Sequence, residues 1–200
     1  MIDTAKKYGV KNIAYTSRSL RDRTTLLNKL MQDHFDTEDY IKKSGLNYII
    51  FQNALYMEFL QFFVNKDHLE KGISLPVGDG KVAFTLRADQ AEAMANVLLQ
   101  EDFGNKTYQF TNNETYSFFD VASILSKLSG KEVKYTPVEL ITFEETMKQK
   151  GLPEAVIKKM GGFLLDIKAN QEAVVTNDLE NKLGRKPTSL NEGLKKLFEF

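Results

Sequence analysis

Residues 12–17 read Asn-Ile-Ala-Tyr-Thr-Ser, and residues 48–53 read Tyr-Ile-Ile-Phe-Gln-Asn. Each segment is a short, continuous apolar run that ends in polar side chains. Continuous runs are typical of strands that are buried on both faces, as in a parallel sheet. Between the two runs, side chains that suit one face of a helix recur at helical spacing: Leu27, Leu30, Met31, His34, Phe35 and Ile41. With a helix tail before residue 12, this order predicts half of a doubly wound α/β unit.

The following segments alternate between helical and extended patterns. An apolar helix is predicted over residues 56–63, and strands are predicted over residues 73–75 and 82–84. The Pro76–Gly80 segment between these strands favours a tight turn, and hence a hairpin. Asp89 begins a sequence with capping-box spacing, which predicts that it caps a helix through Leu99, and we assign Arg87 and Asp89 structural roles.

The C-terminal part shows further strand and helix patterns. Strands are predicted around Tyr108 and Phe110 and around Val133 and Tyr135, with a helix capped by Ser117 between them. A helical segment follows, with predicted breaks at residues 151–153 and 161–162, and Ser189 starts the last helix.

Composition excludes several classes of protein. The chain has 200 residues, 42% of them hydrophobic, with 27 basic and 27 acidic residues and no basic run, so we expect no nucleic-acid partner. Cysteine is absent, which removes disulfides and thiolate chemistry. No segment reaches the roughly 20 apolar residues that cross a bilayer. We therefore expect a cytoplasmic protein with no membrane partner.

Common catalytic motifs are also absent from the sequence. Two histidines without cysteine or a His-Glu-x-x-His pair give no basis for a metal site. There is neither a Gly-x-Ser-x-Gly elbow nor a Gly-x-x-x-x-Gly-Lys-Ser/Thr loop. No tyrosine is followed by lysine four residues later, so the acid–base pair typical of short-chain dehydrogenases is missing. The catalytic residues are therefore left unassigned.

The succession of short motifs resembles the NmrA-like branch of the atypical short-chain dehydrogenases, and within it the NAD(P)H:quinone oxidoreductases. The resemblance is carried, in order along the whole chain, by residues 9–17, 34–38, 44–48, 52–56, 78–81, 85–91, 151–153 and 187–190. It implies an incomplete Rossmann-like parallel sheet with a smaller C-terminal α+β lobe. We place the nucleotide-binding part at residues 1–72 and the substrate lobe at residues 73–200.

The resemblance also implies a cofactor, NADP or NAD, and a quinone-like small-molecule acceptor. In open α/β sheets ligands sit at the carboxyl ends of the strands. The candidate cofactor-binding residues there are Tyr15, Thr16, Ser17, Asn53, Ala54 and Leu55. The candidate substrate-pocket residues are His34, Tyr56 and Phe59. For Thr16 and Ser17 a polar strand end without ligand is an equally good interpretation, and for the three pocket residues half-buried packing is the more common role.

The chain departs from the family pattern at two places. It has Gln52-Asn53-Ala54 where many members have Arg-Asn-Gly, and it contains no glycine-rich turn of the kind that holds a pyrophosphate at a helix N-terminus. The resemblance therefore implies a truncated oxidoreductase whose catalytic activity is weak when the chain acts alone. The sequence does not indicate a preference for NAD or NADP. We also expect the exposed sheet edge at residues 12–17 to pair with another chain or a second copy.

Two other hypotheses remain open at this point. One is a non-catalytic, NAD(P)-sensing regulatory protein of the NmrA type, which the missing Tyr-Lys pair favours. The other is a decayed fragment without activity. Nucleotide binding with hydride transfer would indicate the oxidoreductase, and binding without hydride transfer would indicate the sensor. No nucleotide binding would indicate the decayed fragment.

Overall fold

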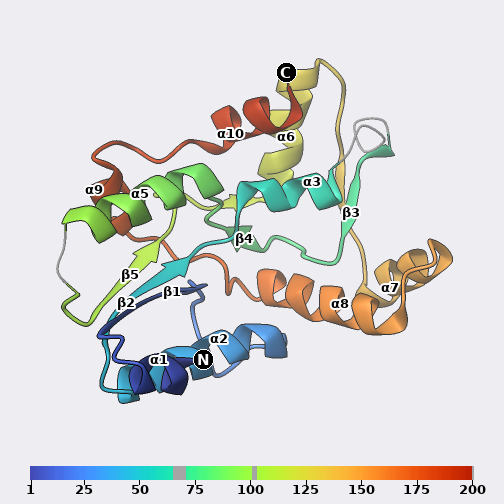
Figure 1. Cartoon of the computed structure of the whole chain (residues 1–200). Helices are drawn as coiled ribbons and strands as arrows, with labels where there is room; N and C mark the ends of the chain where they lie inside the picture. The colour runs from blue at the N-terminus through green and yellow to red at the C-terminus, as the bar shows by residue number, and fades with distance from the viewer. Residues whose placement is uncertain (65–70, 101–102, 200) are drawn as a thin grey trace.

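The computed structural model describes residues 1–64, 71–100 and 103–199, which form a mixed α/β structure (Figure 1). Its elements are α1 (Ile2–Lys7), β1 (Asn12–Arg18), α2 (Lys29–Lys43), β2 (Asn47–Asn53), η1 (Met57–Phe59), α3 (Leu60–Phe63), β3 (Ile73–Leu75), β4 (Lys81–Val82), α5 (Arg87–Gln100), β5 (Lys106–Phe110), β6 (Tyr116–Ser117), α6 (Phe118–Ser129), β7 (Tyr135–Pro137), α7 (Leu140–Gln149), α8 (Glu154–Lys168), α9 (Asp178–Leu183) and α10 (Leu190–Phe198). Among the described residues, no helix combines the length and the apolar character that a membrane-spanning segment needs.

A parallel sheet of strand order β1-β2-β5 confirms the predicted fold class. The apolar runs of β1 and β2 lie side by side, with Asn12 opposite Asn47 and Arg18 opposite Asn53. Gly45 has φ +80° and lies between α2 and β2, where a residue with a side chain would be strained. Both strands consequently end at the same edge of the sheet.

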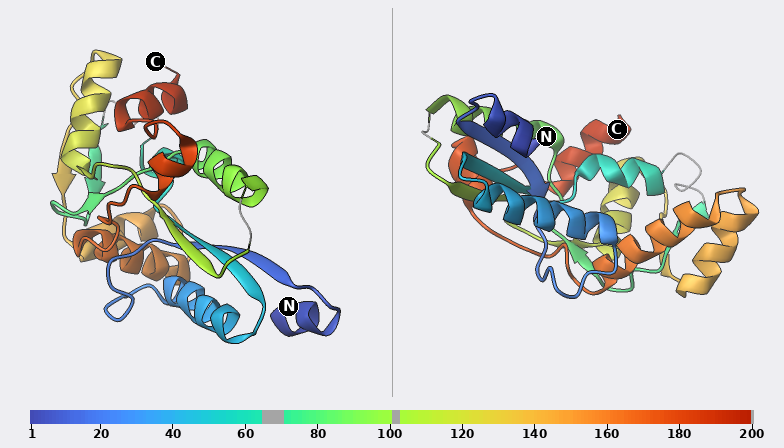
Figure 2. Two further views of the ribbon diagram at one scale, coloured as in Figure 1. Left: turned by 90° about the vertical axis from the view of Figure 1, so that its left-hand side faces the viewer. Right: turned by 60° about the horizontal axis from the view of Figure 1, so that its bottom comes forward.

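Helices cover the two faces of this sheet. Figures 1 and 2 show α1 and α2 on one side, and α5 and α9 on the other. On the α5 side, a hydrophobic cluster joins the sheet to these helices through Ile49, Phe51, Ala93, Val97, Phe110, Leu179 and Leu183. The sheet is therefore the middle layer of three, as expected for a Rossmann-like fold.

A second and larger hydrophobic core lies beyond β2. It is built from buried side chains of η1, α3, β3, β4, α6, β7, α8 and α10, among them Leu60, Phe84, Phe118, Leu125 and Leu164. Capping boxes start two of its helices: Ser117 with Asp120 for α6, and Ser189 with Glu192 for α10. Both caps confirm the prediction from sequence.

The predicted hairpin over residues 73–84 is wrong. β3 pairs in parallel with β7, and β4 pairs antiparallel with β6, so the two segments do not bond to each other. The turn between them packs against other elements instead. Tyr135 donates its hydroxyl hydrogen bond to the carbonyls of Leu75 and Gly78, and a Cβ at Gly80 would lie 2.3 Å from the Ile167 carbonyl oxygen.

Two helix boundaries also differ from the predictions. α5 begins at Arg87, so Asp89 lies inside its first turn and does not cap it; the Asp89 carboxylate accepts hydrogen bonds from Thr188 N–H and from Arg185. α8 runs through Gly161 and Gly162 without a break. Gly161 faces Leu140 of α7, where its lack of a side chain permits close packing.

The division of the chain at residue 72 stays a prediction. β5 lies after this boundary but pairs with β2, which lies before it. The hydrophobic cluster on the α5 side likewise draws residues from both ranges. Any nucleotide-binding unit defined by the sheet must therefore include β5 and its helices.

Candidate functional site at the carboxyl ends of β1 and β2

The predicted cofactor residues meet where β1 and β2 end. Ser17 lies opposite Gln52 in the parallel register, and Arg18 lies opposite Asn53. Ser17 is 3% exposed and Asn53 is 1% exposed. The backbone N–H of Ser19 donates to the Asn53 carbonyl oxygen at 2.9 Å, which continues the pairing past the end of β1. The structure thus brings Ser17 and Asn53 to one edge of the sheet.

Their side chains, however, belong to different faces of the sheet. Side chains alternate along a strand, and residues opposite each other in register share a face. Tyr15 and Gln52 contact α2, through His34 and Glu38 respectively, so Ser17 belongs to the α2 face. Asn53 shares the opposite face with Arg18. A common ligand would have to lie across the end of the sheet and reach both faces.

Several buried polar atoms at this edge have no hydrogen-bond partner among the residues that the structure describes. They are Ser17 Oγ, Ser19 Oγ, Arg18 Nε and both side-chain polar atoms of Asn53. An unsatisfied buried donor or acceptor costs about 1–3 kcal/mol, so a group of them at one place calls for an explanation. Asn53 alone offers one acceptor and two donors, which match an amide ligand such as a carboxamide. The site therefore fits a polar ligand bound at the strand ends.

Arg18, which lies opposite Asn53, places a largely buried cation at this end of the sheet. Its Nη2 donates to both carboxylate oxygens of Glu172, at 2.6 and 2.7 Å, with side-chain exposures of 11% and 1%. Burial raises the pKa of Glu172, and the charge and hydrogen bonds of Arg18 counteract this rise. Sequence reasoning missed both residues, because the two are 154 positions apart and no local pattern links them.

Tyr15 and His34 form a second polar pair on the α2 face. The Tyr15 hydroxyl lies 2.8 Å from His34 Nδ1, and both side chains are half-buried. Burial lowers the pKa of His34, and the Arg18 charge lowers it further. One turn along α2, Glu38 accepts hydrogen bonds from the Gln52 amide at 3.0 Å. α2 therefore presents an imidazole and a carboxylate to the ends of β1 and β2.

The segment between β1 and α2 is held by groups near the end of α8. Asp166 accepts hydrogen bonds from the backbone N–H groups of Leu27 and Asn28, at 2.9 and 3.1 Å. Burial raises the pKa of Asp166, although these two donors lower it. Gln171 bonds the same segment through Asp22 N–H and the Thr25 hydroxyl. These bonds fix the connection that brings His34 to the strand ends.

The remaining candidates have different surroundings. Thr16 is exposed, and Ala54 is buried, with its N–H donating to the Phe110 carbonyl. Leu55 packs in the larger hydrophobic core, which gives its side chain a structural role. The last two are half-buried aromatic residues: Tyr56 lies under the Arg87 guanidinium, and Phe59 contacts the rings of Phe62, Phe63 and Phe163.

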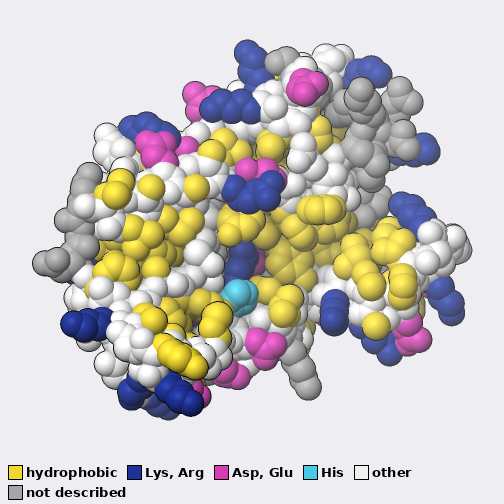
Figure 3. Space-filling model, viewed as in Figure 1, with side chains coloured by type: hydrophobic (Ala, Val, Ile, Leu, Met, Phe, Trp, Pro, Cys, Tyr) yellow, Lys and Arg dark blue, Asp and Glu magenta, His cyan; other side chains and the backbone are white. Residues whose placement is uncertain are grey.

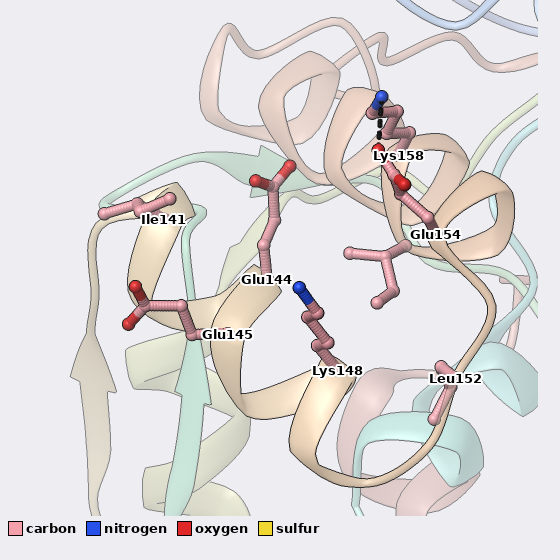
Figure 4. Close-up of a pocket in the computed structure, with 8 residues that line it drawn as sticks. Ile141, Glu144, Glu145, Lys148, Leu152, Glu154 and Lys158 are labelled. Carbon is pink, nitrogen blue, oxygen red and sulfur yellow. Dashed lines mark ion pairs between the residues drawn. The ribbon is translucent and has the colours of Figure 1, made fainter.

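A separate cleft of about 400 Å³ lies between α7 and α8 (Figure 4). It is lined by Ile141, Glu144, Glu145, Lys148, Leu152, Glu154, Ile157 and Lys158. Lys158 and Glu154 pair at 2.7 Å, with side chains 71% and 80% exposed. None of the predicted site residues lines this cleft, and its charged groups are solvated. The buried polar atoms at the strand ends are the better candidate site.

The fold is that of a Rossmann-like α/β protein, a class whose ligands bind at the carboxyl ends of parallel strands, which is where the candidate site lies. Comparison with known proteins then specifies the family. The NmrA-like family model matches residues 1–200, and the chain belongs to this family.

Three relatives illustrate the similarity. Quinone oxidoreductase 2 of Escherichia coli K12 is 31% identical over 202 aligned residues, which cover 99% of this chain and 68% of that protein. The structure of an NADPH-dependent quinone oxidoreductase from Escherichia coli, complexed with NADPH, has a TM-score of 0.88 at 30% identity over 98% of this chain and 69% of that one. A Citrobacter sp. triphenylmethane reductase complexed with NADP(H) has a TM-score of 0.85 at 31% identity over 98% of this chain and 68% of that one.

Proposed function

We propose that this protein is an NAD(P)H-dependent oxidoreductase that reduces a quinone-like small molecule. The observation that carries the proposal is the group of unpartnered buried polar atoms of Ser17, Ser19 and Asn53 at the strand ends. Membership of the NmrA-like family supports it, as do two similar reductases whose structures contain NADPH or NADP(H). The alternative of a non-catalytic NAD(P) sensor is not favoured, because the three similar proteins described above are an oxidoreductase or a reductase.

In this proposal Asn53 holds the carboxamide of the nicotinamide, and Ser17 and Ser19 bond to polar atoms nearby. We also assign Tyr15, Thr16 and the backbone of Ala54 and Leu55 to this cofactor-binding position. Bound NAD(P)H supplies a hydride for transfer to the acceptor. Because the site is buried, it also excludes water from the reacting atoms.

We place the acceptor beside the half-buried side chains of His34, Tyr56 and Phe59. A flat quinone ring needs apolar walls and few polar anchors, and these aromatic side chains meet that need. A cytoplasmic location and self-association through the exposed edge of β1 both stay predictions.

The substitution Asn53→Leu tests the site without relying on turnover. Its polar atoms have no partner, so an apolar side chain of similar shape should leave the folded protein as stable or more stable, by up to about 1–3 kcal/mol. The same substitution should weaken NADPH binding at least tenfold. The measurements are urea denaturation and the change in nucleotide fluorescence on titration with protein.

Asn112→Leu is the matched control. Asn112 is also a buried asparagine, but its amide donates to the carbonyls of Phe84 and Thr188, at 2.9 and 3.1 Å. This variant should lose stability and keep nucleotide binding in its folded fraction. Equal NADPH affinity in the wild type and the Asn53→Leu variant would contradict the proposed site.

Turnover is tested by mixing the protein with NADPH and a benzoquinone and following the loss of NADPH absorbance. We expect oxidation that depends on both protein and quinone. NADPH binding without oxidation would support the sensor hypothesis instead. Failure to bind either nucleotide would reject both.

A further inference from the structure

The Tyr15–His34 pair supplies a group that the sequence analysis left unassigned. No tyrosine in the chain has a lysine four residues later, so the reaction needs another source for its proton. Tyr15 Oη lies 2.8 Å from His34 Nδ1, and the two rings lie with centroids 6.0 Å apart. The His34 side chain is half-buried, so part of it is exposed to solvent, and Figure 3 colours histidine cyan. The pair thus connects solvent with the interior of the site.

Ser17 extends this pair towards the strand end. It follows Tyr15 by two positions, so both side chains belong to the α2 face of β1. Ser17 Oγ is buried and has no hydrogen-bond partner in residues 1–64, 71–100 and 103–199. The tyrosine hydroxyl and the serine hydroxyl therefore come from the same face of β1, two positions apart.

The other charged groups around His34 leave its imidazole available to exchange protons. Glu38, one turn along α2, is already bonded to Gln52 and to Lys42. Burial and Arg18 of β1 lower the pKa of His34, whereas Glu38 and Asp33 of α2 raise it by less. The imidazolium is therefore a stronger acid than free histidine, so it gives up its proton more readily but is populated mainly below pH 6.5.

This inference rests on the proposed function. We propose that Tyr15 is the catalytic proton donor to the oxygen of the reduced acceptor and that His34 restores the tyrosine proton. Ser17 hydrogen-bonds the same oxygen. The hydride brings two electrons and one hydrogen to the quinone and leaves one oxygen anionic. The Tyr15 O–H bond breaks as the new O–H bond of the hydroquinone forms. Imidazolium at His34 returns a proton to Tyr15, and water reprotonates the imidazole, so one NAD(P)H and one proton are consumed for each hydroquinone.

Kinetics provides the first test. Tyr15→Phe and His34→Gln should each lower kcat for quinone reduction by about 100-fold or more, in the range of general acid catalysis, and His34→Gln should leave NADPH affinity unchanged. In the wild type kcat should fall with rising pH above the His34 pKa, which lies below 6.5. This dependence should vanish in His34→Gln. Tyr40→Phe is the matched control, because Tyr40 lies on α2 but bonds to Asp3 instead.

Proton NMR provides a readout that does not need turnover. The chain has two histidines, so His68→Gln leaves the His34 imidazole as the one histidine signal. Adding hydroquinone should shift this signal and its titration midpoint, and Tyr15→Phe should abolish the change in midpoint while hydroquinone still binds.

The outcomes separate the two proposals. If the wild type reduces quinone and both Tyr15→Phe and His34→Gln keep kcat within threefold with the wild-type pH profile, the proton-donor role is wrong and the proposed function stands. If the wild type neither binds NADPH nor reduces quinone, the proposed function fails and the proton-donor role fails with it, and the NMR experiment then shows only whether the pair contacts hydroquinone. Hydroquinone that binds without affecting His34, or that does not bind at all, overturns the role.

Discussion

Replacement of Arg18 by methionine tests the buried ion pair that supports the site. The substitution keeps an unbranched side chain but removes the guanidinium that donates to both oxygens of Glu172, at 2.6 and 2.7 Å. Glu172 is 1% exposed at its side chain, so solvent cannot replace the lost donors. The variant therefore contains a buried carboxylate whose charge is uncompensated.

The expected loss in free energy of unfolding follows from this burial. Removal of one partner of a buried ion pair costs about 3–5 kcal/mol. For a protein of this size, 1 kcal/mol corresponds to roughly 2–4 °C in Tm, so Tm should fall by about 6–20 °C. Replacing both partners, in Arg18→Met with Glu172→Met, should recover most of this loss because no unpaired charge then remains buried.

The stability difference between Arg18→Met and the wild type should depend on pH. Without Arg18, burial and, to a lesser degree, the charge of Asp166 hold the folded-state pKa of Glu172 further above its ordinary value of 4.5. A raised pKa stabilises the folded state fully below the unfolded pKa, and this stabilisation is lost as pH rises through the folded pKa. The deficit of Arg18→Met relative to the wild type should therefore be smallest near pH 4.5 and grow towards neutral pH, as measured by urea denaturation across that range.

Arg23→Met is the matched control for an exposed pair. Arg23 bonds to Asp39, but their side chains are 42% and 37% exposed. A solvent-exposed pair contributes at most about 1 kcal/mol, so this variant should be close to the wild type. If Arg18→Met is no less stable than Arg23→Met, or if its deficit does not depend on pH, the reasoning from burial is refuted.

Two further predictions concern stability. Gly162→Ala should stabilise α8 by about 0.5–1 kcal/mol, because alanine favours a helix and the nearest neighbouring atom would lie 3.6 Å from the new Cβ; Gly161→Ala should show no gain, because Leu140 Cδ1 would lie at 3.1 Å. Thermal denaturation of both variants checks this pair, and an equal gain in both would contradict it. Burial would raise the pKa of Asp89, but the hydrogen bond from Thr188 N–H and its other partners outweigh burial and lower it below 3.8. A lowered pKa gives stability above pH 3.8 that is lost as pH falls through the folded pKa, so acid titration should show this loss in the wild type and not in Asp89→Asn.

The sequence by itself determined the parallel sheet, the order of elements around it and the caps of α6 and α10. These features depend on short patterns: apolar runs at β1 and β2, and a serine three residues before an acidic residue at Ser117 and Ser189. The sequence also placed Ser17 and Asn53 at one sheet edge, because parallel strands end on the same side.

Only the tertiary structure decided which strands pair and which charges meet. β3 looked like one arm of a hairpin, yet its hydrogen bonds go to β7, about sixty residues later. Arg18 forms an ion pair with Glu172, 154 residues later in the chain. Tyr15 forms a hydrogen bond with His34, and the segment that connects them is held by α8. Such contacts depend on how separate elements pack, and no local pattern encodes that packing. The face on which each strand-end side chain lies was likewise fixed by the register of β1 against β2.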